Sequence, residues 1–422
     1  MISYHSTRDR NAEHRLTASQ AILKGLADDG GLFVPSSLPQ LPDDLDTSLD
    51  YGLFASRVLA PFFEGDELQG KLEDICRKAF DFPIVIRDLE RLSVLELFHG
   101  PTAAFKDFGA RFLAFSMETL LERSGKDLTI LVATSGDTGG AVASAFHGRK
   151  HLSVKVLFPK GRVAERQRKQ LTCWDGNVES YEVDGSFDDC QAMVKAAFMD
   201  PVLKDGLSSA NSINLGRLLP QMVYYVYASM RYMEVHHKKP VVIIPSGNVG
   251  NCTGAYWAKE MGAPIARIVL AVNANRTIPD YLEEGVYRPR PSVRTLANAM
   301  DVGAPSNMER IFDLYRTVDE VRANLSAWSV GDDEIRKTIQ DAYHDEGYIM
   351  CPHTACAEHV RRSHFADRDD VLIVSTAHPA KFETIVEPLL GLEVPLPESL
   401  SSLLDRKSVY RSIGTDWREL FS

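Results

Sequence analysis

Cysteine and long apolar runs are both scarce in this chain of 422 residues. Its six cysteines, at positions 76, 173, 190, 252, 351 and 356, follow no regular spacing. This excludes a scaffold stapled by disulfides and indicates reduced thiols. No stretch approaches the roughly 18 apolar residues that a membrane span needs, and the polar residues 1–10 exclude a signal peptide. We therefore expect a cytoplasmic protein.

Basic residues are also fewer than acidic ones. The chain has 47 Lys and Arg residues against 58 Asp and Glu, a formal net charge of -11, which argues against nucleic acid and anionic membrane surfaces as partners. A small molecule remains as the expected partner, because a local basic pocket can still hold an anion. Hydrophobic residues make up 44% of the chain and charged residues 25%, a composition that can bury sizeable cores.

Sequence patterns divide the chain into three parts, in keeping with its length. Residues 1–93 predict a mostly helical segment, residues 94–232 a first α/β unit, and residues 233–422 a second. Buried-strand patterns alternate with helical ones at 129–133, 154–158, 178–183, 241–244, 267–272 and 370–374. This alternation predicts an α/β fold with parallel sheets wrapped by helices.

Lys106 lies in a stretch, residues 97–110, that is otherwise small and apolar around it. If a helix begins at residue 103, after a Gly-Pro turn, the residues three and four positions away from the lysine are Thr102, Ala103, Gly109 and Ala110. Such a close-packed face would desolvate the ammonium, lower its pKa and favour the neutral amine that Schiff-base chemistry needs. The alternative is a lysine that snorkels from a core helix to solvent.

Two loops of small residues each follow a predicted strand and precede a helix. Residues 133–140 read Ala-Thr-Ser-Gly-Asp-Thr-Gly-Gly, and residues 245–251 read Pro-Ser-Gly-Asn-Val-Gly-Asn. Glycines allow close backbone approach and helix N-termini attract anions, so either loop could bind a phosphate. Plain turns with helix caps are the alternative. Since neither loop carries a dinucleotide fingerprint or a Walker lysine, the pair favours a phosphorylated cofactor over a nucleotide.

Two further segments combine polar groups at the start of a helix or the end of a strand. Residues 209–217 lead into a helix, and Asn211 and Arg217 could converge there on a phosphate, for which arginine is a good bidentate clamp. The alternative is a capping cluster with a surface arginine. Residues 375–382 follow the last predicted strand, where α/β sheets bind ligands, and a hydroxyl there could meet a ring nitrogen.

A metal site is the reading we reject for the cluster Cys351, His353, Cys356 and His359. Its spacing matches no structural zinc pattern. The small residues between these side chains indicate a tight helix start instead, so we predict no metal.

The order of these motifs resembles the threonine synthase family of bacteria and fungi, which belongs to the fold type II pyridoxal-phosphate enzymes. The string His-Gly-Pro-Thr-Ala-Ala-Phe-Lys-Asp-Phe-Gly around Lys106 resembles the family's cofactor-lysine motif. The other motifs follow in the family's order: 135–139, 211–214 with Arg217 and Gln221, 247–250 and 376–382. Residues 4–8 and 30–35 resemble its N-terminal signatures.

The resemblance implies pyridoxal 5′-phosphate as cofactor and Lys106 as the catalytic residue that holds it and shuttles protons. The cofactor phosphate is then expected in the loop formed by Gly247, Asn248, Val249, Gly250 and Asn251, with Thr376 at the pyridine nitrogen. The substrate phosphate is expected to be held by Ser135, Thr138, Asn211, Asn214 and Arg217. One departure stands in the cofactor loop, which reads Ser-Gly-Asn-Val-Gly-Asn where family members often have Thr-Gly-Asn-Phe-Gly-Asp.

The implied reaction converts O-phospho-L-homoserine and water to L-threonine and phosphate by γ-elimination and β-addition, which makes the protein a carbon–oxygen lyase acting on a phosphate ester. A related phospholyase that releases a keto acid would use the same lysine and loops. A non-catalytic sensor of phosphorylated ligands is an alternative from another class. The sequence leaves the oligomeric state open, a monomer included.

Overall fold

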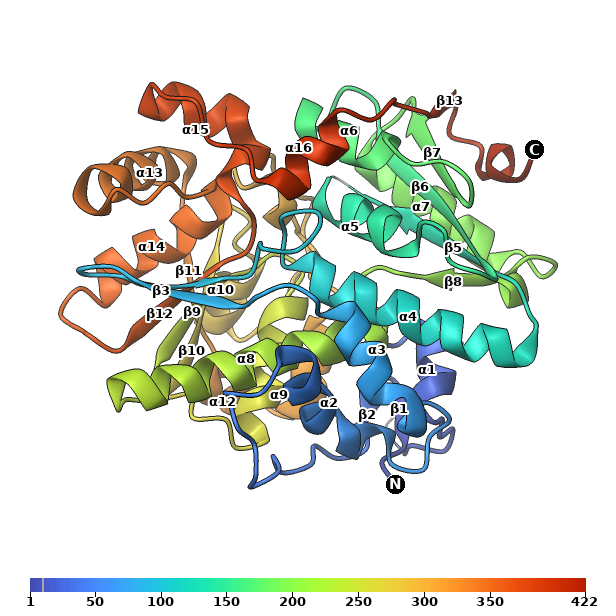
Figure 1. The fold of residues 1–422 in the computed structure, drawn as a ribbon, viewed down its shortest axis with the longest axis horizontal. Coiled ribbons are helices and arrows are strands. Elements are labelled where there is room, and N and C mark those ends of the chain that lie inside the picture. Colours follow the sequence, from blue (N-terminus) through green and yellow to red (C-terminus); the bar gives the residue numbers. More distant parts are fainter. Residues whose placement is uncertain (10, 135) are drawn as a thin grey trace.

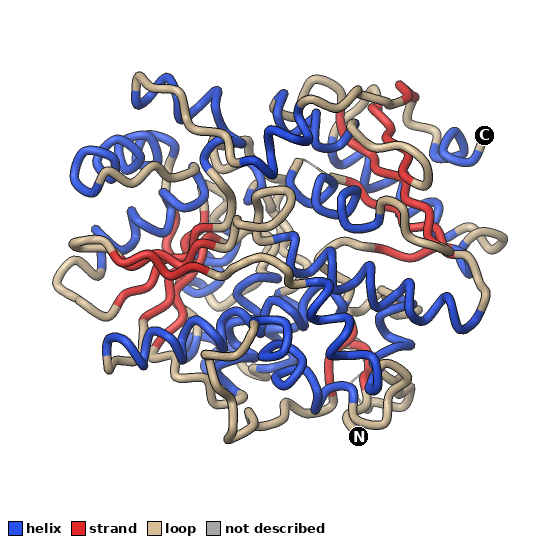
Figure 2. The backbone as a smooth tube through the Cα atoms, viewed as in Figure 1, coloured by secondary structure: helices blue, strands red, loops and turns tan. Residues whose placement is uncertain are grey.

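Two separate β-sheets organise the chain, as the red strands in Figure 2 show. The computed structural model describes residues 1–9, 11–134 and 136–422. One sheet has the strand order β11-β10-β9-β12-β4-β3 and the other β13-β7-β6-β5-β8. Neighbouring strands are parallel in both, except that β3 runs antiparallel to β4. The predicted α/β class with parallel sheets is confirmed.

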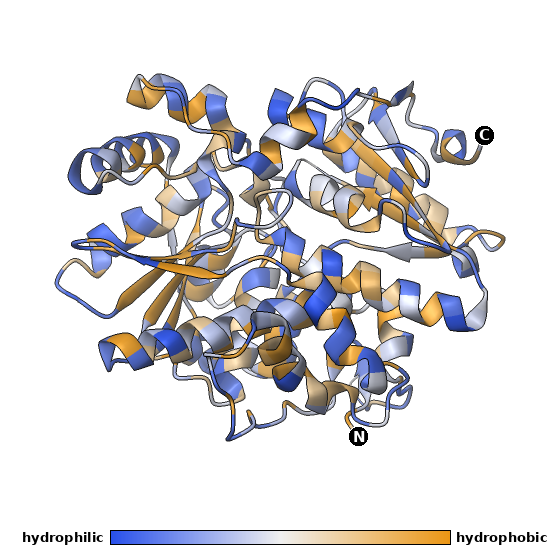
Figure 3. Cartoon of the chain, viewed as in Figure 1, coloured by the Kyte–Doolittle hydropathy of each residue, from blue (hydrophilic) through white to orange (hydrophobic). Residues whose placement is uncertain are grey.

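The strands are short and mostly buried, and in Figure 3 the orange of hydrophobic residues marks much of both sheets. Parallel strands covered on both faces are expected to be rich in Val, Ile and Leu. The six-stranded sheet contains β3 (Val85–Asp88), β4 (Ser93–Glu96), β9 (Val241–Pro245), β10 (Arg267–Val272), β11 (Ser326–Ser329) and β12 (Val371–Ser375). The five-stranded sheet contains β5 (Leu128–Ala133), β6 (Leu152–Pro159), β7 (Val178–Val183), β8 (Leu207–Ser209) and β13 (Arg411–Ile413).

Helices cover both sheets and fill the space between them (Figure 1). In the middle of the molecule, α8 packs against both α4 and α9. Nearly every residue in the first two thirds of α8 is buried, as expected for a helix that is apolar all round. The central and C-terminal helices are α4 (Lys106–Ser124), α5 (Asp137–Phe146), α6 (Glu165–Thr172), α7 (Phe187–Met199), α8 (Leu215–His236), α9 (Gly250–Glu260), α10 (Thr277–Glu284), α11 (Met308–Leu314), α12 (Val318–Asn324), α13 (Asp332–Glu346), α14 (Pro352–His364), η5 (Pro379–Phe382), α15 (Glu383–Leu390) and α16 (Glu398–Leu404).

The N-terminal segment packs beneath α4 and α8, at the bottom of Figure 1. It contains the antiparallel pair β1 (Tyr4–Ser6) and β2 (Phe33–Pro35) and the helices α1 (Ala18–Lys24), α2 (Tyr51–Leu59) and α3 (Leu72–Ala79). Aromatic side chains of this segment pack against the central helices. The ring centroids of Tyr51 and of Tyr227 on α8 are 5.4 Å apart, and those of Phe82 and of Phe108 on α4 are 4.8 Å apart. Such edge-to-face pairs add to the stabilisation from burial.

Sheet membership crosses the predicted divisions at residues 93 and 232. Strand β3 lies in the predicted N-terminal segment and β4 at the start of the predicted first α/β unit, but both join the sheet of the second. Strand β13 lies near the C-terminus, yet it pairs in parallel with β7 of the first sheet. The three-part division therefore stays a prediction about folding units, and it does not describe the sheets.

Several helix starts differ from the sequence-based expectation. Helix α4 begins at Lys106 and not at Ala103, because Ala103 has a left-handed φ of 53° that no helix continues. Helix α5 begins at Asp137 and α9 at Gly250, each earlier than expected. Within the described residues, no helix combines the length and the apolar character that crossing a membrane would require.

Candidate active site

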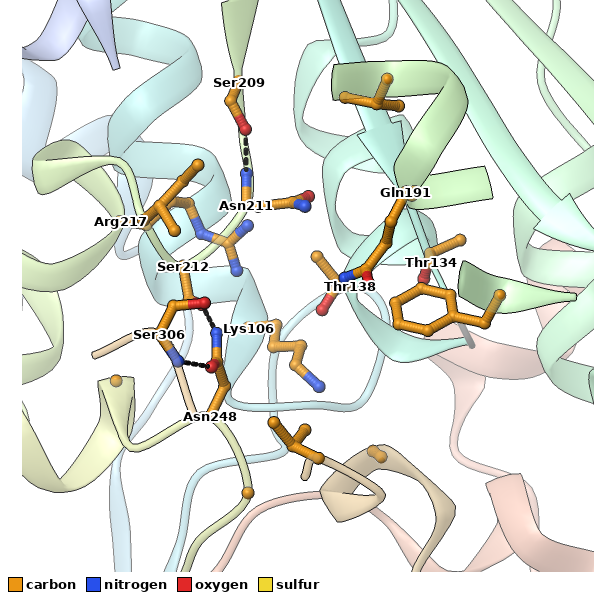
Figure 4. Close-up of a pocket in the computed structure, with 18 of the residues that line it drawn as sticks. Lys106, Thr134, Thr138, Gln191, Ser209, Asn211, Ser212, Arg217, Asn248 and Ser306 are labelled. Atoms are coloured by element: carbon orange, nitrogen blue, oxygen red, sulfur yellow. Dashed lines mark hydrogen bonds between the residues drawn. The ribbon is translucent and has the colours of Figure 1, made fainter. Parts of the chain in front are cut away.

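A cavity of about 1980 Å³ lies between the two sheets. The N-terminal ends of α4, α5 and α9 reach it, and so do the start of α8 and the segment after β12. Figure 4 shows Lys106, Thr138, Asn211 and Arg217 converging on this space from different elements. The carboxyl ends of parallel strands meet at such a place, which is where open α/β sheets bind ligands.

Lys106 is the first residue of α4, and its amine points into the cavity. Burial lowers the pKa of Lys106 to about 8, and the positive charges of Lys381 and Arg217 act in the same direction. The Asp137 carboxylate opposes this shift without cancelling it. A cation at a helix N-terminus is also disfavoured by the helix dipole. The alternative, a lysine that snorkels to solvent, does not match this buried amine with its lowered pKa.

A buried aspartate fixes the turn that presents Lys106. Asp107 accepts hydrogen bonds from the backbone N–H of Thr102 at 2.9 Å and from its hydroxyl at 2.6 Å. A Cβ on Gly100 would lie 2.5 Å from the carboxylate of Asp107. Residues 100–102 and 106–107 of the motif therefore fold as one unit. The Asp107 carboxylate accepts the N–H and hydroxyl of Thr102, and Gly100 leaves room for that carboxylate.

The small face of α4 packs against Arg217. A Cβ on Gly109 would come within 2.7 Å of the Arg217 carbonyl and 2.8 Å of its Nε, so this position admits no side chain. Arg217 is 2% exposed, and its Nη1 donates to the carbonyl of Ala210. Its Nε is buried without a partner among the described residues. Burial lowers the pKa of Arg217 to about 10, a value at which the guanidinium remains charged at neutral pH.

The loop between β9 and α9 has a strained backbone. Val249 precedes α9 with φ 65° and ψ -3°, a left-handed conformation that a β-branched residue rarely adopts. The side chain of Asn248 holds the loop by donating to the Ser212 hydroxyl at 2.7 Å and accepting from the Ser306 N–H at 2.6 Å (Figure 4). Asn307 donates to the carbonyl of Asn248 at 3.0 Å. The first N–H groups of α9, which have no partner inside the helix, lie beside the cavity.

Asn251 presents a polar group to the same cavity. Its Oδ1 accepts hydrogen bonds from the hydroxyl of Tyr224 and, at 2.9 Å, from that of Tyr225. Its Nδ2 is buried with no partner among the described residues. Two donors on one oxygen orient the amide, so the nitrogen is left as a donor for a ligand.

The segment after β12 supplies Thr376 and lies against the Lys106 turn. Thr376 lines the cavity, and its carbonyl accepts from the N–H of Phe105 at 2.9 Å. His353 of α14 also lines the cavity, where its Nε2 accepts from the N–H of Ala299 at 3.1 Å. Burial lowers the pKa of His353 to about 4, so this imidazole is neutral near pH 7.

Asn214, one of the predicted ligands of the substrate phosphate, has a structural role. Asn214 caps α8: it accepts from Gly216 at 2.8 Å and donates to the carbonyls of Ile22 and Ser209 at 3.0 and 2.9 Å. Its side chain is fully buried and does not line the cavity. The prediction for Asn214 is therefore wrong, because its polar atoms are already used. Thr138 and Asn211 do line the cavity, and Ser135 lies outside the described residues.

Arg310 and Asn307 are residues that the sequence did not single out. Arg310 is fully buried, and it donates to the carbonyls of Phe33, Ser212 and Ile213 and to Asn307 Oδ1. It thus ties the N-terminal segment to two cavity loops. Because Phe33 and Arg310 are 277 positions apart, no local sequence signal could have revealed this contact.

Comparison with known proteins connects these features. Residues 89–377 match the family described as pyridoxal-phosphate dependent enzyme, residues 3–80 the threonine synthase N terminus, and residues 354–421 the threonine synthase C-terminal family. Threonine synthase from Serratia marcescens is 41% identical over 426 residues, which cover 99% of this chain and 98% of that protein.

The chain belongs to the threonine synthase family. The crystal structure of threonine synthase from Escherichia coli matches with a TM-score of 0.89 and 37% identity, covering 99% of this chain and 98% of that one. A pyridoxal-phosphate-bound threonine synthase from Brucella melitensis matches with a TM-score of 0.91 and 34% identity, covering 100% and 98%. The fold type II assignment and the cofactor predicted from the motifs are confirmed.

The cavity of this threonine synthase family member fits pyridoxal 5′-phosphate. Schiff-base chemistry needs an enclosed lysine with a lowered pKa, and Lys106 is one. A phosphate needs backbone donors at a helix N-terminus, which α9 offers. The buried Nδ2 of Asn251, which has no partner among the described residues, lies at the same cavity and can donate to a polar ligand there.

The Cys351 to His359 cluster serves the structure of α14. Cys351 precedes the helix and contacts the Thr354 hydroxyl at 3.3 Å, while His353 faces the cavity. His359 points elsewhere, toward Thr338 and Ser363. Among the residues that the structure describes, no group of three or more His, Cys, Asp or Glu side chains is arranged to hold a metal ion.

Proposed function

We propose that this protein is a threonine synthase that converts O-phospho-L-homoserine and water to L-threonine and phosphate, with Lys106 as its catalytic residue. The observation that carries the proposal is the meeting of three groups on one cavity: the low-pKa amine of Lys106, the N-terminus of α9 and the buried guanidinium of Arg217. One amine and two separate anion positions match a substrate and a cofactor that each carry a phosphate.

Lys106 holds the cofactor and then moves protons at its Nζ. With a pKa of about 8, roughly a tenth of this amine is neutral at pH 7, a few hundred times the fraction for an ordinary lysine. Once bound, pyridoxal phosphate supplies the electron sink that makes protons next to the amino-acid carbon acidic. The neutral amine of Lys106 can take such a proton and return it, as general acid–base catalysis requires.

The loop from Gly247 to Asn251 holds the cofactor phosphate, mainly through backbone N–H groups. The left-handed Val249 starts α9 abruptly, so that the N–H groups of Gly250 and Asn251 follow it at the helix terminus. Gly247 lies close to Met300, since a Cβ there would be 2.6 Å from the Met300 Cα. Asn248 contributes by fixing the loop through its side chain.

Thr376 meets the pyridine nitrogen of the cofactor. Its hydroxyl can donate to that nitrogen or accept from it, but it carries no charge. A neutral partner does not stabilise a protonated ring as a carboxylate would. The neighbouring His353 is neutral as well, so no charge from either side chain favours protonation of the ring.

Arg217 holds the substrate phosphate, together with Asn211, Thr138 and Ser135. Arg217 lines the cavity, where Figure 4 shows its guanidinium, and charged hydrogen bonds to phosphate are the strong ones. Asn211 and Thr138 reach the cavity from the start of α8 and from α5. Arg8 does not line the cavity; its partly exposed side chain pairs with Glu309 at 2.7 Å.

The cytoplasm is the compartment we propose. All six cysteines are buried and none is disulfide-bonded, which suits a reducing environment. The substrate that we assign is a small anionic metabolite, in keeping with the expected small-molecule partner.

Product analysis tests the proposal. Purified protein with pyridoxal phosphate and O-phospho-L-homoserine should release phosphate and threonine in equal amounts, each measured separately. Lys106→Ala should form neither product, while Lys407→Ala, at an exposed lysine, should retain full activity. Phosphate released together with a keto acid in place of threonine would assign the protein to the phospholyases. No phosphate release at all would refute the proposal.

A further inference from the structure

A second buried lysine lies beside the Lys106 turn. Lys381 of η5 is 1% exposed, and its Nζ donates to the carbonyl of Thr102 at 2.8 Å. The same Nζ lies 2.9 Å from Oδ1 of Asp137, the first residue of α5. Asp137 also accepts from Gln167 Nε2 at 3.0 Å. One ammonium therefore connects the turn before Lys106, the segment after β12 and the glycine loop after β5.

This ion pair is unusual because both partners are almost fully buried. Removing two charges from water costs several kcal/mol per ion. Burial alone would raise the pKa of Asp137, but Lys381 and Lys106 together hold it well below its usual range. Asp137 is thus an anion shared by two ammonium groups.

We propose that Lys381 is a positioning residue that occupies the Asp137 carboxylate and thereby sets the protonation equilibrium at the nitrogen of Lys106. With Lys381 present, its positive charge offsets part of the attraction of Asp137 for a cation at Lys106. Without Lys381, the full negative charge of Asp137 would act on Lys106. This proposal rests on the assignment of Lys106 as the cofactor lysine.

The other groups that face Lys106 do not replace this control. Arg217 of α8 adds positive charge whatever the state of Lys381. His353 of α14 is neutral near pH 7, with a pKa lowered to about 4. Asp107, the next residue on α4, uses its carboxylate on Thr102. Lys381 and Asp137 are therefore the oppositely charged pair near Lys106 whose balance a substitution of either partner removes.

The expected effects have opposite signs for the two partners. Lys381→Met removes a repelling cation and frees Asp137, so a cation at Lys106 becomes more stable and its pKa rises. Asp137→Asn removes the attracting anion, so the pKa falls. Lys381→Arg keeps the charge and should keep the pKa. The double variant Lys381→Met/Asp137→Asn removes both charges and should return close to the starting value.

The experiment is a pH titration of the visible absorption band of the bound cofactor, from pH 5 to pH 10, in the holoenzyme. We expect Lys381→Met to move the midpoint upward and Asp137→Asn to move it downward, each by about half a pH unit or more. Lys155→Met serves as the matched control. Lys155 of β6 pairs with Glu179 of β7 at 2.7 Å and does not line the cavity, so the titration midpoint of this variant should stay unchanged.

Each outcome decides the matter. A purely structural clamp would lower the thermal midpoint of Lys381→Met without moving the titration midpoint, and this result would overturn the proposal. If Lys381→Met does not fold, Asp137→Asn decides alone, and an unchanged midpoint overturns the proposal. Borohydride reduction and peptide mapping of each preparation distinguish a failure of the proposed function from a failure of this proposal. A label on another lysine refutes the assignment of Lys106, whereas a label on Lys106 with an unchanged titration midpoint refutes only the role of Lys381.

Discussion

Removing the guanidinium of Arg217 tests how the substrate phosphate is held. Arg217 is buried, packed against Gly109, and has one N–H group without a partner in the described part of the chain. Loss of a hydrogen bond to a charged group costs about 1.5–3 kcal/mol, which corresponds to a roughly ten- to hundredfold lower kcat/KM. We expect Arg217→Ala to lose at least that much with O-phospho-L-homoserine.

The surroundings of Arg217 add a second expectation. Its positive charge lowers the pKa of Lys106, so Arg217→Ala should also move the low-pH limb of the rate profile to higher pH. Arg217→Lys should return the low-pH limb to its original position but recover little of the affinity for the substrate phosphate, because an ammonium supplies charge but not a planar fork of donors.

Steady-state kinetics across pH, for both variants and for Arg162→Ala, form the assay. Arg162 is an exposed arginine at the same cavity, so its removal should change kcat/KM less than twofold, within the usual range for an exposed charge. Unchanged kinetics for Arg217→Ala together with a large loss for Arg162→Ala would refute the reasoning, since the phosphate would then be held at the rim.

Three further predictions concern the cofactor amine and the loops. The rate at which added pyridoxal phosphate develops its absorption band should rise with pH through a midpoint near 8, because only the neutral form of Lys106 reacts; a midpoint above pH 10 would contradict a lowered pKa. Gly247→Ala should weaken cofactor binding, measured by fluorescence titration, more than Gly250→Ala. The new Cβ at position 247 would lie 2.6 Å from the backbone of Met300, whereas the Cβ at position 250 would come no closer than 3.3 Å to a neighbouring atom, in the side chain of Asn307. Equal effects would show that steric crowding does not control this loop. Arg310→Met should lower the free energy of unfolding in urea by about 3 kcal/mol or more, since it strands several buried carbonyls; a change under 1 kcal/mol would mean that water replaces the guanidinium.

Local patterns were enough to predict six strands, β5, β6, β7, β9, β10 and β12, but they did not predict β3, β4, β8, β11 or β13. The predicted ranges 178–183 and 267–272 coincide with β7 and β10. β10 is a run of mostly buried aliphatic residues, and β7 has a valine at each end and a tyrosine between them, residue types that are enriched in strands. The glycine loops could be placed for the same reason, since each interrupts a strand–helix pattern. Their position at the cavity follows from strand direction.

Contacts between distant residues were beyond the sequence. Helix α4 starts at Lys106 because the preceding turn pairs with the segment after β12, through Phe105 and Thr376 among others. Asn214 looked like a phosphate ligand, since an amide before a helix can either bind a ligand or cap the helix, and only the partners distinguish the two. The partner of Lys381 is another example, because Asp137 lies in a different sheet unit.

Covalent mapping of the cofactor tests the central claim most directly. The holoenzyme is reduced with borohydride, digested, and the pyridoxyl-modified peptide is identified by mass spectrometry, with Lys106→Ala as the parallel sample. The account predicts a single modified residue, Lys106, and no modified peptide from Lys106→Ala. Modification of Lys381 or of any other lysine in the unsubstituted protein would contradict the account.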